Sequence, residues 1–390
     1  MNSDHVVFTI FLIFAGAGLV ATVALFARQA LLIAYILIGA VLGPWGLGYI
    51  HDAELIKDIA HIGIIFLLFL IGLNLQPQEL INMVKKTTLV TLVSSLVFSA
   101  VGFSIAAAWG FSLVESLLIG IATSFSSTIV GLKLLPTTIL HHQHTGEIII
   151  SILLLQDLIA IVLLMLLQGA GASESFAAWD MIKLLVTLPL FIGFAWLTER
   201  YVLLPLFSRF DRIQEYIFLM AIAWCLSMSE LAHLVGLSSE IGAFIAGITL
   251  ATSPIALFIA ESLKPLRDFF LIMFFFSLGA GFNLGMIGDI VVPGMLLAVA
   301  VMLIKPPVFR WLLLKSGEKL KRSNEVGYRL GQMSEFSLLI AVLALDVGVM
   351  TEKGAYLLQF ATVMTFLFST YIVVSRFQSP IALSDHLRRD

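Results

Sequence analysis

Residues 148–173 read IIISILLLQDLIAIVLLMLLQGAGAS, an apolar stretch long enough to cross a bilayer in which Asp157 is the only charged residue. Counted from Glu147, Asp157 lies about 15 Å along the predicted helix. That depth is close to the midplane of a hydrocarbon core about 30 Å thick. A carboxylate there costs several kcal/mol unless it is paired, hydrated or protonated. The stretch therefore predicts a membrane helix that carries an ion or proton site at Asp157.

The composition of the whole chain indicates an integral membrane protein. Of its 390 residues, 60% are hydrophobic and 12% are charged, whereas a soluble domain carries about 25% charged residues. The sequence contains neither an HExxH motif nor a nucleophile elbow, so we expect no enzyme activity, no cofactor and no bound metal. The expected partners are K⁺ or Na⁺, H⁺ and the lipid bilayer, and no nucleic acid.

Thirteen apolar segments, separated by Gly, Pro or charge clusters, are expected to form transmembrane helices. The predicted fold is an all-α integral membrane protein, with residues 1–390 forming a single transmembrane transporter domain. The predicted spans are residues 5–26, 30–43, 55–74, 87–108, 114–133, 147–168, 181–204, 215–234, 239–251, 257–281, 289–314, 324–346 and 354–375.

The basic residues are distributed unequally between the two sides of this predicted topology. One set of alternate loops and ends carries sixteen Lys or Arg residues, and the opposite set carries three. Because cytoplasmic loops are enriched in Lys and Arg, we expect a cytoplasmic C-terminus and an N-terminus outside. The larger set is Arg28, Lys85, Lys86, Lys133, Arg200, Arg209, Arg212, Lys264, Arg267, Lys315, Lys319, Lys321, Arg322, Arg376, Arg388 and Arg389, and the smaller is Lys57, Lys183 and Lys353.

A weak internal repeat relates the two halves of the chain. FLLFLIGLNL at 66–75 resembles FFFSLGAGFNL at 274–284, and IGA at 38–40 resembles IGA at 241–243. Predicted spans two to six would then match spans nine to thirteen. The copies are offset by an odd number of crossings, so they are expected to be inverted in the membrane. Inverted repeats are typical of secondary transporters with a substrate site at the midplane. Chance matching of apolar strings is the alternative.

Asp157 and Gln156 are the first candidates for ion binding. Burial disfavours the charged form of a carboxyl group, which suits a group that releases a proton when it takes up a cation. Gln156 adds a carbonyl oxygen without adding a second charge. The structural alternative is a protonated Asp157 that hydrogen-bonds across a helix interface.

Lys305 is the second candidate, because it is a cation inside the predicted span 289–314. A buried ammonium exchanges its proton readily. Pro306 and Pro307 free backbone carbonyls and disfavour helix at Lys305, so we expect a bend there. The natural partner is Asp157, in a salt bridge of the ion-free state. The alternative is that Lys305 extends to the cytoplasmic edge of its span.

The fifth predicted span contains TSFSST at 123–128, in which five of six residues carry a hydroxyl. We interpret it as a broken helix whose unwound peptide groups and hydroxyls face a cavity. Ser126, Ser127 and Thr128 are therefore candidates for cation or proton binding. Packing of small hydroxylated residues between helices is the alternative.

The twelfth span contains the equivalent interruption, RLGQMSEF at 329–336. A broken helix exposes a negative end that favours a cation and a positive end that favours an anion. Arg329 and Glu335 are therefore expected to compensate these ends and to influence coupling, with direct ion binding as the alternative.

The sequence HHQH places His141, His142 and His144 in a predicted cytoplasmic loop after the fifth span. No set of Cys or carboxylate ligands accompanies them, so we do not expect a metal site. We expect an exposed loop, with a contribution to pH sensing as the alternative.

Taken in order, these motifs resemble the cation:proton antiporter superfamily and, within it, the Kef-type potassium/proton antiporters. The resemblance covers nearly the whole chain and rests on GPWGLG at 43–48, FLLFLIGL at 66–73, SST at 126–128, LQD at 155–157 and SEF at 334–336. It implies inverted repeats with two crossed broken helices, in a core of about residues 87–168 and 289–375. It also implies a scaffold and dimerisation domain, about residues 1–74 and 181–281, and an elevator-like movement of the core in a homodimer.

Two departures from the Kef-type pattern affect the functional hypothesis. Kef-type proteins often end in a cytosolic nucleotide-binding regulatory domain, and we expect none in this chain, which continues for about 15 residues after the last predicted span. Sodium-selective relatives often carry two carboxylates or Asn-Asp where this chain has Gln156-Asp157, so K⁺ is favoured over Na⁺.

The resemblance implies a secondary active cation:proton antiporter of the inner membrane with a role in pH homeostasis. A Na⁺(Li⁺)/H⁺ antiporter of the same fold is the first alternative. A cation channel is the alternative from another class, but a channel needs no titratable group at the midplane.

Overall fold

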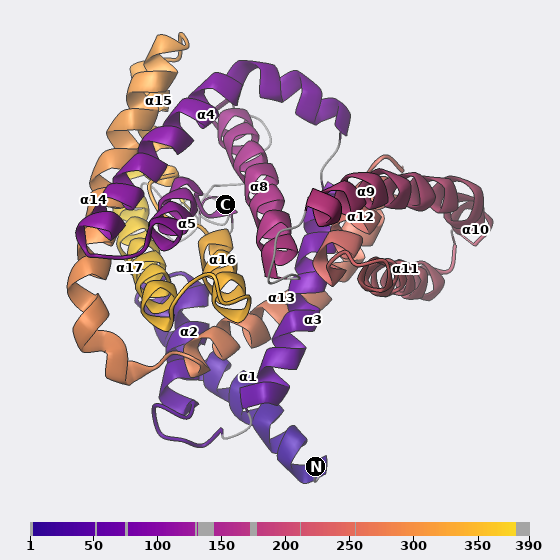
Figure 1. Cartoon of the computed structure of the whole chain (residues 1–390), viewed down its shortest axis with the longest axis horizontal. Coiled ribbons are helices and arrows are strands. Elements are labelled where there is room, and N and C mark those ends of the chain that lie inside the picture. The colour runs from indigo at the N-terminus through magenta and orange to yellow at the C-terminus, as the bar shows by residue number, and fades with distance from the viewer. Residues whose placement is uncertain are drawn as a thin grey trace.

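The computed structural model of the protein describes residues 3–50, 53–74, 77–128, 131, 144–171, 178–210, 212–253 and 255–379. These residues form helices joined by short loops (Figure 1). The helices of the first half are α1 (Ser3–Phe26), α2 (Leu31–Leu42), α3 (Ala53–Asn74), α4 (Pro77–Ala108), α5 (Leu113–Ser124), α8 (His144–Gly171), α9 (Ala178–Thr198), the π-helical η1 (Glu199–Leu203) and α10 (Leu204–Arg209). Those of the second half are α11 (Gln214–Leu234), α12 (Ser239–Ala251), α13 (Ala256–Ala280), the 3₁₀ turn η2 (Leu284–Met286), α14 (Ile287–Lys315), α15 (Leu320–Arg329), α16 (Glu335–Asp346) and α17 (Glu352–Arg376).

The helices have the length and composition of a multi-pass membrane protein. Seven helices of the described chain are long and apolar enough to cross a bilayer, and four shorter helical stretches are also apolar. Each of the thirteen predicted spans coincides with one helix or with consecutive helices, so the all-α prediction is confirmed. The twelfth span is divided into α15 and α16, and the helix of the fifth span stops at Ser124.

The helix contacts have the symmetry of the predicted repeat. The repeat exchanges α2 with α12, α3 with α13, α4 with α14, α5 with α15 and α16, and α8 with α17. The observed contact of α2 with α13 then corresponds to that of α3 with α12. In the same way, the α4–α8 contact corresponds to α14–α17, and the α4–α5 contact to α14–α15.

Glycines allow the backbones of two of these pairs to meet. A Cβ atom on Gly39 would collide with the carbonyl oxygen of Phe276, so α2 and α13 touch backbone to backbone. A Cβ atom on Gly247 would collide with the carbonyl oxygen of Phe69, which joins α3 to α12 in the same way. Such close approach through small residues is a principal source of helix association in membranes.

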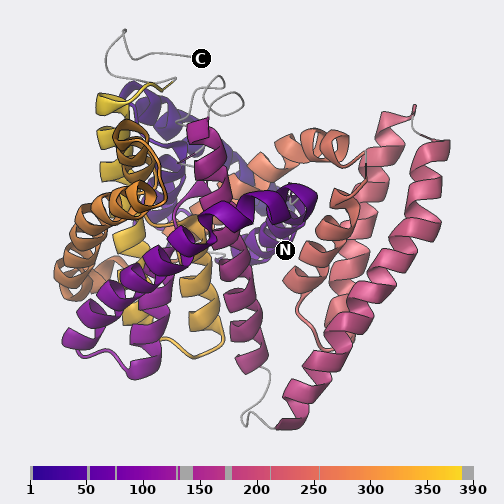
Figure 2. The ribbon, with the colours of Figure 1, turned by 90° about the horizontal axis from the view of Figure 1, so that it is seen from above.

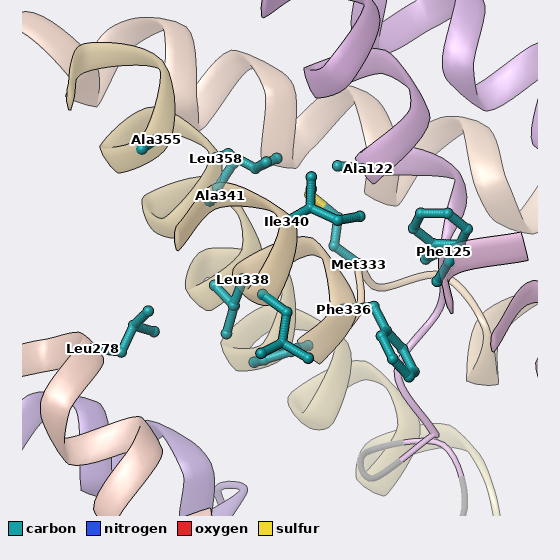
Figure 3. Close-up of a cluster of buried hydrophobic side chains, with 14 of the residues drawn as sticks. Ala122, Phe125, Leu278, Met333, Phe336, Leu338, Ile340, Ala341, Ala355 and Leu358 are labelled. Atoms are coloured by element: carbon teal, nitrogen blue, oxygen red, sulfur yellow. The ribbon is translucent and has the colours of Figure 1, made fainter. Parts of the chain in front are cut away.

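The apolar side chains form more than one cluster. In Figure 1, α9, α10, α11 and α12 lie on one side, α4, α5 and α14–α17 lie on the other, and α8 lies between them; Figure 2 shows the same separation from above. A cluster around α16 includes Ala122, Met333, Phe336 and Leu358 (Figure 3). A second cluster joins α3, α9, α11, α12 and α13 and contains Cys225, which is buried.

Candidate functional site

Two interrupted helices cross each other in the structure. After α5, Phe125 has extended backbone (φ −74°, ψ 145°). Between α15 and α16, Ser334 is also extended (φ −117°, ψ 157°), and its side chain accepts a hydrogen bond from the N–H of Phe336. The hydroxyl of Ser126 donates to the carbonyl oxygen of Leu330 at 2.9 Å, and that of Ser337 donates to the carbonyl oxygen of Ala122 at 2.7 Å. The predicted pair of crossed broken helices is therefore present.

Lys305 holds this crossing together. Its Nζ atom donates to the carbonyl oxygen of Phe125 at 2.7 Å and to that of Gln332 at 2.9 Å. It also lies 3.3 Å from the Ser126 hydroxyl and 5.3 Å from the centre of the Phe98 ring. The ammonium thus compensates the negative, C-terminal end of α5.

The predicted salt bridge between Lys305 and Asp157 is not formed in this structure. The ammonium contacts backbone carbonyls because the two chain breaks bring carbonyl oxygens to it from both sides. The alternative of extension to the cytoplasmic edge is also wrong, because Lys305 is 0% exposed. Pro306 and Pro307 lie within the continuous helix α14.

Gln156 fixes the unwound end of α5. Its Oε1 atom accepts the backbone N–H of Ser126 at 3.0 Å, and its Nε2 atom donates to the carbonyl oxygen of Ser124 at 3.0 Å. The buried amide therefore replaces two backbone hydrogen bonds that the helix loses where it breaks. The carbonyl oxygen that we expected at the ion is already bonded to the backbone in this conformation, although its second lone pair is free to accept.

Asp157 lines a cavity of about 490 Å³, which we call the Asp157 cavity. The Thr128 hydroxyl is 3.2 Å and 3.4 Å from the two carboxylate oxygens. Glu335, the first residue of α16, lines the same cavity, and so do Lys264 and Arg267 of α13. The cavity thus combines two carboxyl groups and a hydroxyl with walls that are largely apolar.

Glu335 and Arg329 occupy the two helix ends on either side of the second interruption. Glu335 is in the first turn of α16 and Arg329 in the last turn of α15, the positions at which a helix dipole favours these charges. Arg329 also bonds to Glu325 at 2.9 Å and to the carbonyl oxygen of Gln378 at 2.7 Å. Arg329 therefore contacts the segment that follows α17 and does not line the Asp157 cavity.

Two further cavities lie at the opposite ends of the helices that form the Asp157 cavity. One, of about 270 Å³, is lined by His61, Glu240 and Asp346 and by apolar residues of α8 and α16. The other, of about 160 Å³, lies between α3, α13, α16 and α17. All three cavities lie where α3 and its neighbours face α16. Asp157 lines the Asp157 cavity of about 490 Å³ and lines neither of the two smaller cavities.

The histidine cluster is described in part. His141 and His142 lie outside the described residues. His144 begins α8 and bonds to Glu147 at 2.6 Å and to Glu318 at 3.0 Å, and Glu318 bonds to Arg322 at 2.7 Å. Burial raises the pKa of Glu318, but the hydrogen bonds from Arg322 and His144 outweigh burial and hold this pKa below its usual range. Among the described residues no group of three or more His, Cys, Asp or Glu side chains could hold a metal ion.

Comparison with known families gives one match that covers nearly the whole chain. Residues 9–377 match the family model described as sodium/hydrogen exchanger, transmembrane. The chain belongs to the sodium/hydrogen exchanger family. It is accordingly a membrane transporter of a cation/proton antiporter family and not an enzyme.

Two relatives and a solved structure match nearly the whole chain. The exchanger is 27% identical over 367 residues to the iron transporter MagA of Paramagnetospirillum magneticum, covering 93% of this chain and 84% of MagA. It is 28% identical over 372 residues to K(+) efflux antiporter 4 of Arabidopsis thaliana, covering 93% of this chain and 62% of that protein. The fold is similar to that of the sodium proton antiporter MjNhaP1 from Methanocaldococcus jannaschii, with a TM-score of 0.65, 17% identity and coverage of 95% and 96% of the two chains.

Some polar residues of the exchanger's crossing were not predicted. Gln332 bonds through its side chain to the carbonyl oxygen of Ser127 and to the hydroxyl of Ser369, at 3.4 and 2.9 Å. The Thr365 hydroxyl accepts the N–H of Met333 at 3.0 Å. The sequence signal for them was present, because Thr365 and Ser369 are four residues apart and lie on one face of an otherwise apolar span.

Proposed function

We propose that the protein exchanges a monovalent cation, with K⁺ favoured over Na⁺, for protons at Asp157. The observation that carries the proposal is the position of this carboxyl group beside the crossed helices, on a cavity that it shares with Thr128 and Glu335. A carboxyl group in such surroundings holds either a proton or a cation, because an uncompensated charge there is unfavourable. Competition of the two ions for one group, combined with alternating access of that group to the two sides of the membrane, gives exchange.

Alternating access is proposed to follow from movement of a core against a scaffold. The core would comprise about residues 87–168 and 289–375, and the scaffold about residues 1–74 and 181–281. Two cavities support this arrangement. The Asp157 cavity and the cavity of about 270 Å³ lie at opposite ends of the interface between α3 and the pair α8 and α16, and Asp157 lines only the Asp157 cavity. Sliding of α8 and α16 along α3 would close the Asp157 cavity and bring Asp157 towards the other two.

The preference for K⁺ rests on the chemistry at the site. Asp157 is next to a neutral amide and not to a second carboxylate, so its field is weaker than that of an Asp-Asp pair. Na⁺ holds its water more strongly than K⁺, and a weak field favours the ion that is easier to dehydrate. The relative in Arabidopsis thaliana is named for K⁺ efflux. Glu335, which lines the same cavity, is the feature that favours the Na⁺ alternative.

Transport of iron, after the name of MagA, is less well supported. Transition metals prefer clusters of His, Cys and carboxylate ligands. The described part of the chain holds no group of three or more such side chains suited to a metal ion.

The proposal also covers the orientation of the protein in the membrane, its oligomeric state and its physiological role. The distribution of Lys and Arg supports an inner-membrane orientation with the C-terminus in the cytoplasm, which puts the Lys264 end of the Asp157 cavity on the cytoplasmic side. The family resemblance supports a homodimer and a role in pH homeostasis. Side chains of α1 such as Phe11, Leu19 and Val23 are exposed and would face lipid or a second copy.

The experiment is proton flux in proteoliposomes loaded with a pH-sensitive dye. Addition of K⁺, Na⁺ or Li⁺ to the wild type is expected to release protons, with K⁺ effective at the lowest concentration. Asp157→Asn keeps the size of the side chain and removes its exchangeable charge, so it is expected to abolish the signal. Exchange by Asp157→Asn at the wild-type rate would disprove the assignment, and a lower apparent KM for Na⁺ than for K⁺ would replace the K⁺ preference.

A further inference from the structure

The cavity of about 160 Å³ between α3, α13, α16 and α17 is distinct from the Asp157 cavity. We call it the Gln359 cavity. Its polar lining is His61, Ser277, Gly281, Asp346, Tyr356 and Gln359. Asp346 is at the opposite end of α16 from Glu335, a rise of about 16 Å. The two cavities therefore contact opposite ends of the same helix.

A buried oxygen at this cavity has no hydrogen-bond donor. Gln359 is 5% exposed, and within the described part of the chain no donor reaches its Oε1 atom. Folded proteins leave few such oxygens, and a bound ion or water commonly accounts for them. The terminal torsion of Gln is broad, so a small rotation turns Oε1 towards the space that the side chain lines.

The electrostatics of the Gln359 cavity favour a cation. Helix α13 ends at Ala280 and α16 ends at Asp346, so two negative helix ends meet here. Asp346 adds a carboxylate at a helix end that by itself disfavours negative charge. Its lining contains no Lys or Arg among the described residues, and His61 lies 3.5 Å from Glu240.

We propose that the Gln359 cavity is a second cation site, which binds a monovalent cation through the Asp346 carboxylate, the Gln359 amide oxygen and the Gly281 carbonyl oxygen. The Gly281 oxygen already accepts the Tyr356 hydroxyl at 3.1 Å and has a second lone pair. Hard cations select oxygen ligands, and one carboxylate among neutral oxygens suits a single positive charge. The site would hold an ion on the side of the protein remote from Asp157 before that ion reaches Asp157. The proposal rests on the proposed function only for the identity of the ion.

The test is equilibrium binding of ⁸⁶Rb⁺, a substitute for K⁺, to the purified full chain. The background is Asp157→Asn, which removes the proposed transport site. This variant is expected to retain saturable ⁸⁶Rb⁺ binding, and the double variants with Gln359→Leu or Asp346→Asn are expected to lose it. Absence of saturable binding in Asp157→Asn, or equal binding in the double variants, would overturn the proposal. Asp346 is at the surface, so Asp346→Asn is expected to fold even if Gln359→Leu does not.

Two controls assign the binding specifically to the Gln359 cavity. Gln29 also has a buried Oε1 atom without a partner but does not line the Gln359 cavity, so Gln29→Leu in the Asp157→Asn background is expected to bind like its parent. Proton flux in the wild type is measured in parallel. Failure of that flux would refute the proposed exchange, whereas the binding result in Asp157→Asn decides the second site independently.

Discussion

The ammonium of Lys305 lies 2.7 Å from the carbonyl oxygen of Phe125, the first residue after the helical part of α5. A second bond, to the carbonyl oxygen of Gln332, joins the same ammonium to the interruption between α15 and α16. One buried cation thus connects the interruptions of both broken helices, at Phe125 and Gln332, which are more than 200 residues apart in sequence. This gives Lys305 a structural role in addition to any role in coupling.

Lys305→Met is therefore expected to destabilise the protein. The two carbonyl oxygens would lose charge-assisted hydrogen bonds worth about 1.5–3 kcal/mol each. We expect a reduced free energy of unfolding and a lower Tm in detergent. Lys305→Arg keeps the charge and should lose less. A Tm of Lys305→Met equal to that of the wild type would contradict the structural role.

The same residue provides a test of coupling. If Lys305 exchanges a proton during transport, Lys305→Gln should shift the pH profile of activity and change its response to membrane voltage. If Lys305 is only a fixed counter-charge, Lys305→Gln should leave the pH profile and the response to membrane voltage unchanged. Proteoliposome flux at several pH values and imposed potentials distinguishes these outcomes.

Thr128 is expected to tune the affinity of Asp157 for the cation. Its hydroxyl donates to the carboxylate over 3.2 Å, a long bond whose loss should cost about 1 kcal/mol. Thr128→Val should therefore raise the apparent KM for the cation by about fivefold. Thr128→Ser keeps the hydroxyl and serves as the control. An unchanged KM in Thr128→Val, which keeps the methyl group and loses only the hydroxyl, would contradict the role of the hydrogen bond.

Gln156→Glu is expected to move selectivity towards Na⁺. The variant keeps an oxygen for the N–H of Ser126, loses the donor to the carbonyl oxygen of Ser124, and adds a carboxylate beside Asp157. Two adjacent carboxylates give a stronger field and titrate as a pair. The ratio of apparent K⁺ and Na⁺ affinities at several pH values is the measurement. Gln156→Leu, which removes both bonds without adding charge, separates the loss of the helix brace from the change in field. An unchanged ratio in Gln156→Glu would contradict the role of field strength.

The sequence predicted the spans and the crossing well because these depend on local composition. Long apolar segments must be helical in a bilayer, and the hydroxyl-rich 123–128 and the polar 329–336 interrupt two of them. The partners of the polar residues could not be predicted in the same way. Lys305 donates hydrogen bonds to backbone carbonyl oxygens, and the sequence does not distinguish these carbonyls from any others. The side-chain amide of Gln156 bonds to the backbone of Ser124 and Ser126 where α5 is interrupted. The Gln359 cavity depends on four helices that are distant in sequence and meet only in the folded chain.

Glu318 is expected to contribute to stability in a pH-dependent way. Its pKa is lower in the folded protein than in an unfolded chain, where it is about 4.3. The contribution is therefore present above pH 4.3 and is lost as the pH falls through the lower folded value. Glu318→Gln should be less stable by about 1 kcal/mol at pH 7, since the ion pairs are partly exposed. Thermal unfolding at pH 7 and at about pH 3 checks this, because the difference should shrink as the pH falls below the unfolded pKa. Glu261→Gln, which breaks an exposed pair with Lys264, should show a smaller difference. A Glu318→Gln difference that does not shrink in acid would show that the carboxylate charge is not its cause.

The glycines of the α2–α13 contact are expected to be intolerant of a side chain. A Cβ atom on Gly39 would meet the carbonyl oxygen of Phe276, and one on Gly279 would meet that of Ile36, both of them backbone atoms that cannot rotate away. Gly39→Ala and Gly279→Ala should each lower the free energy of unfolding by about 1–3 kcal/mol, the usual cost of overpacking. Gly288, in the first turn of α14, has no atom within 4 Å of the site of its Cβ, so Gly288→Ala is the matched control and should unfold at the wild-type temperature or above it.

The double variant Gly39→Ala/Gly279→Ala should lose less free energy of unfolding than the sum of the losses in the two single variants. Both glycines lie in one contact, and a helix pair already forced apart by one methyl group accommodates the second. Thermal unfolding of the wild type and the four variants in detergent is the measurement, and single variants as stable as Gly288→Ala would show that α2 and α13 do not meet as closely as the structure describes.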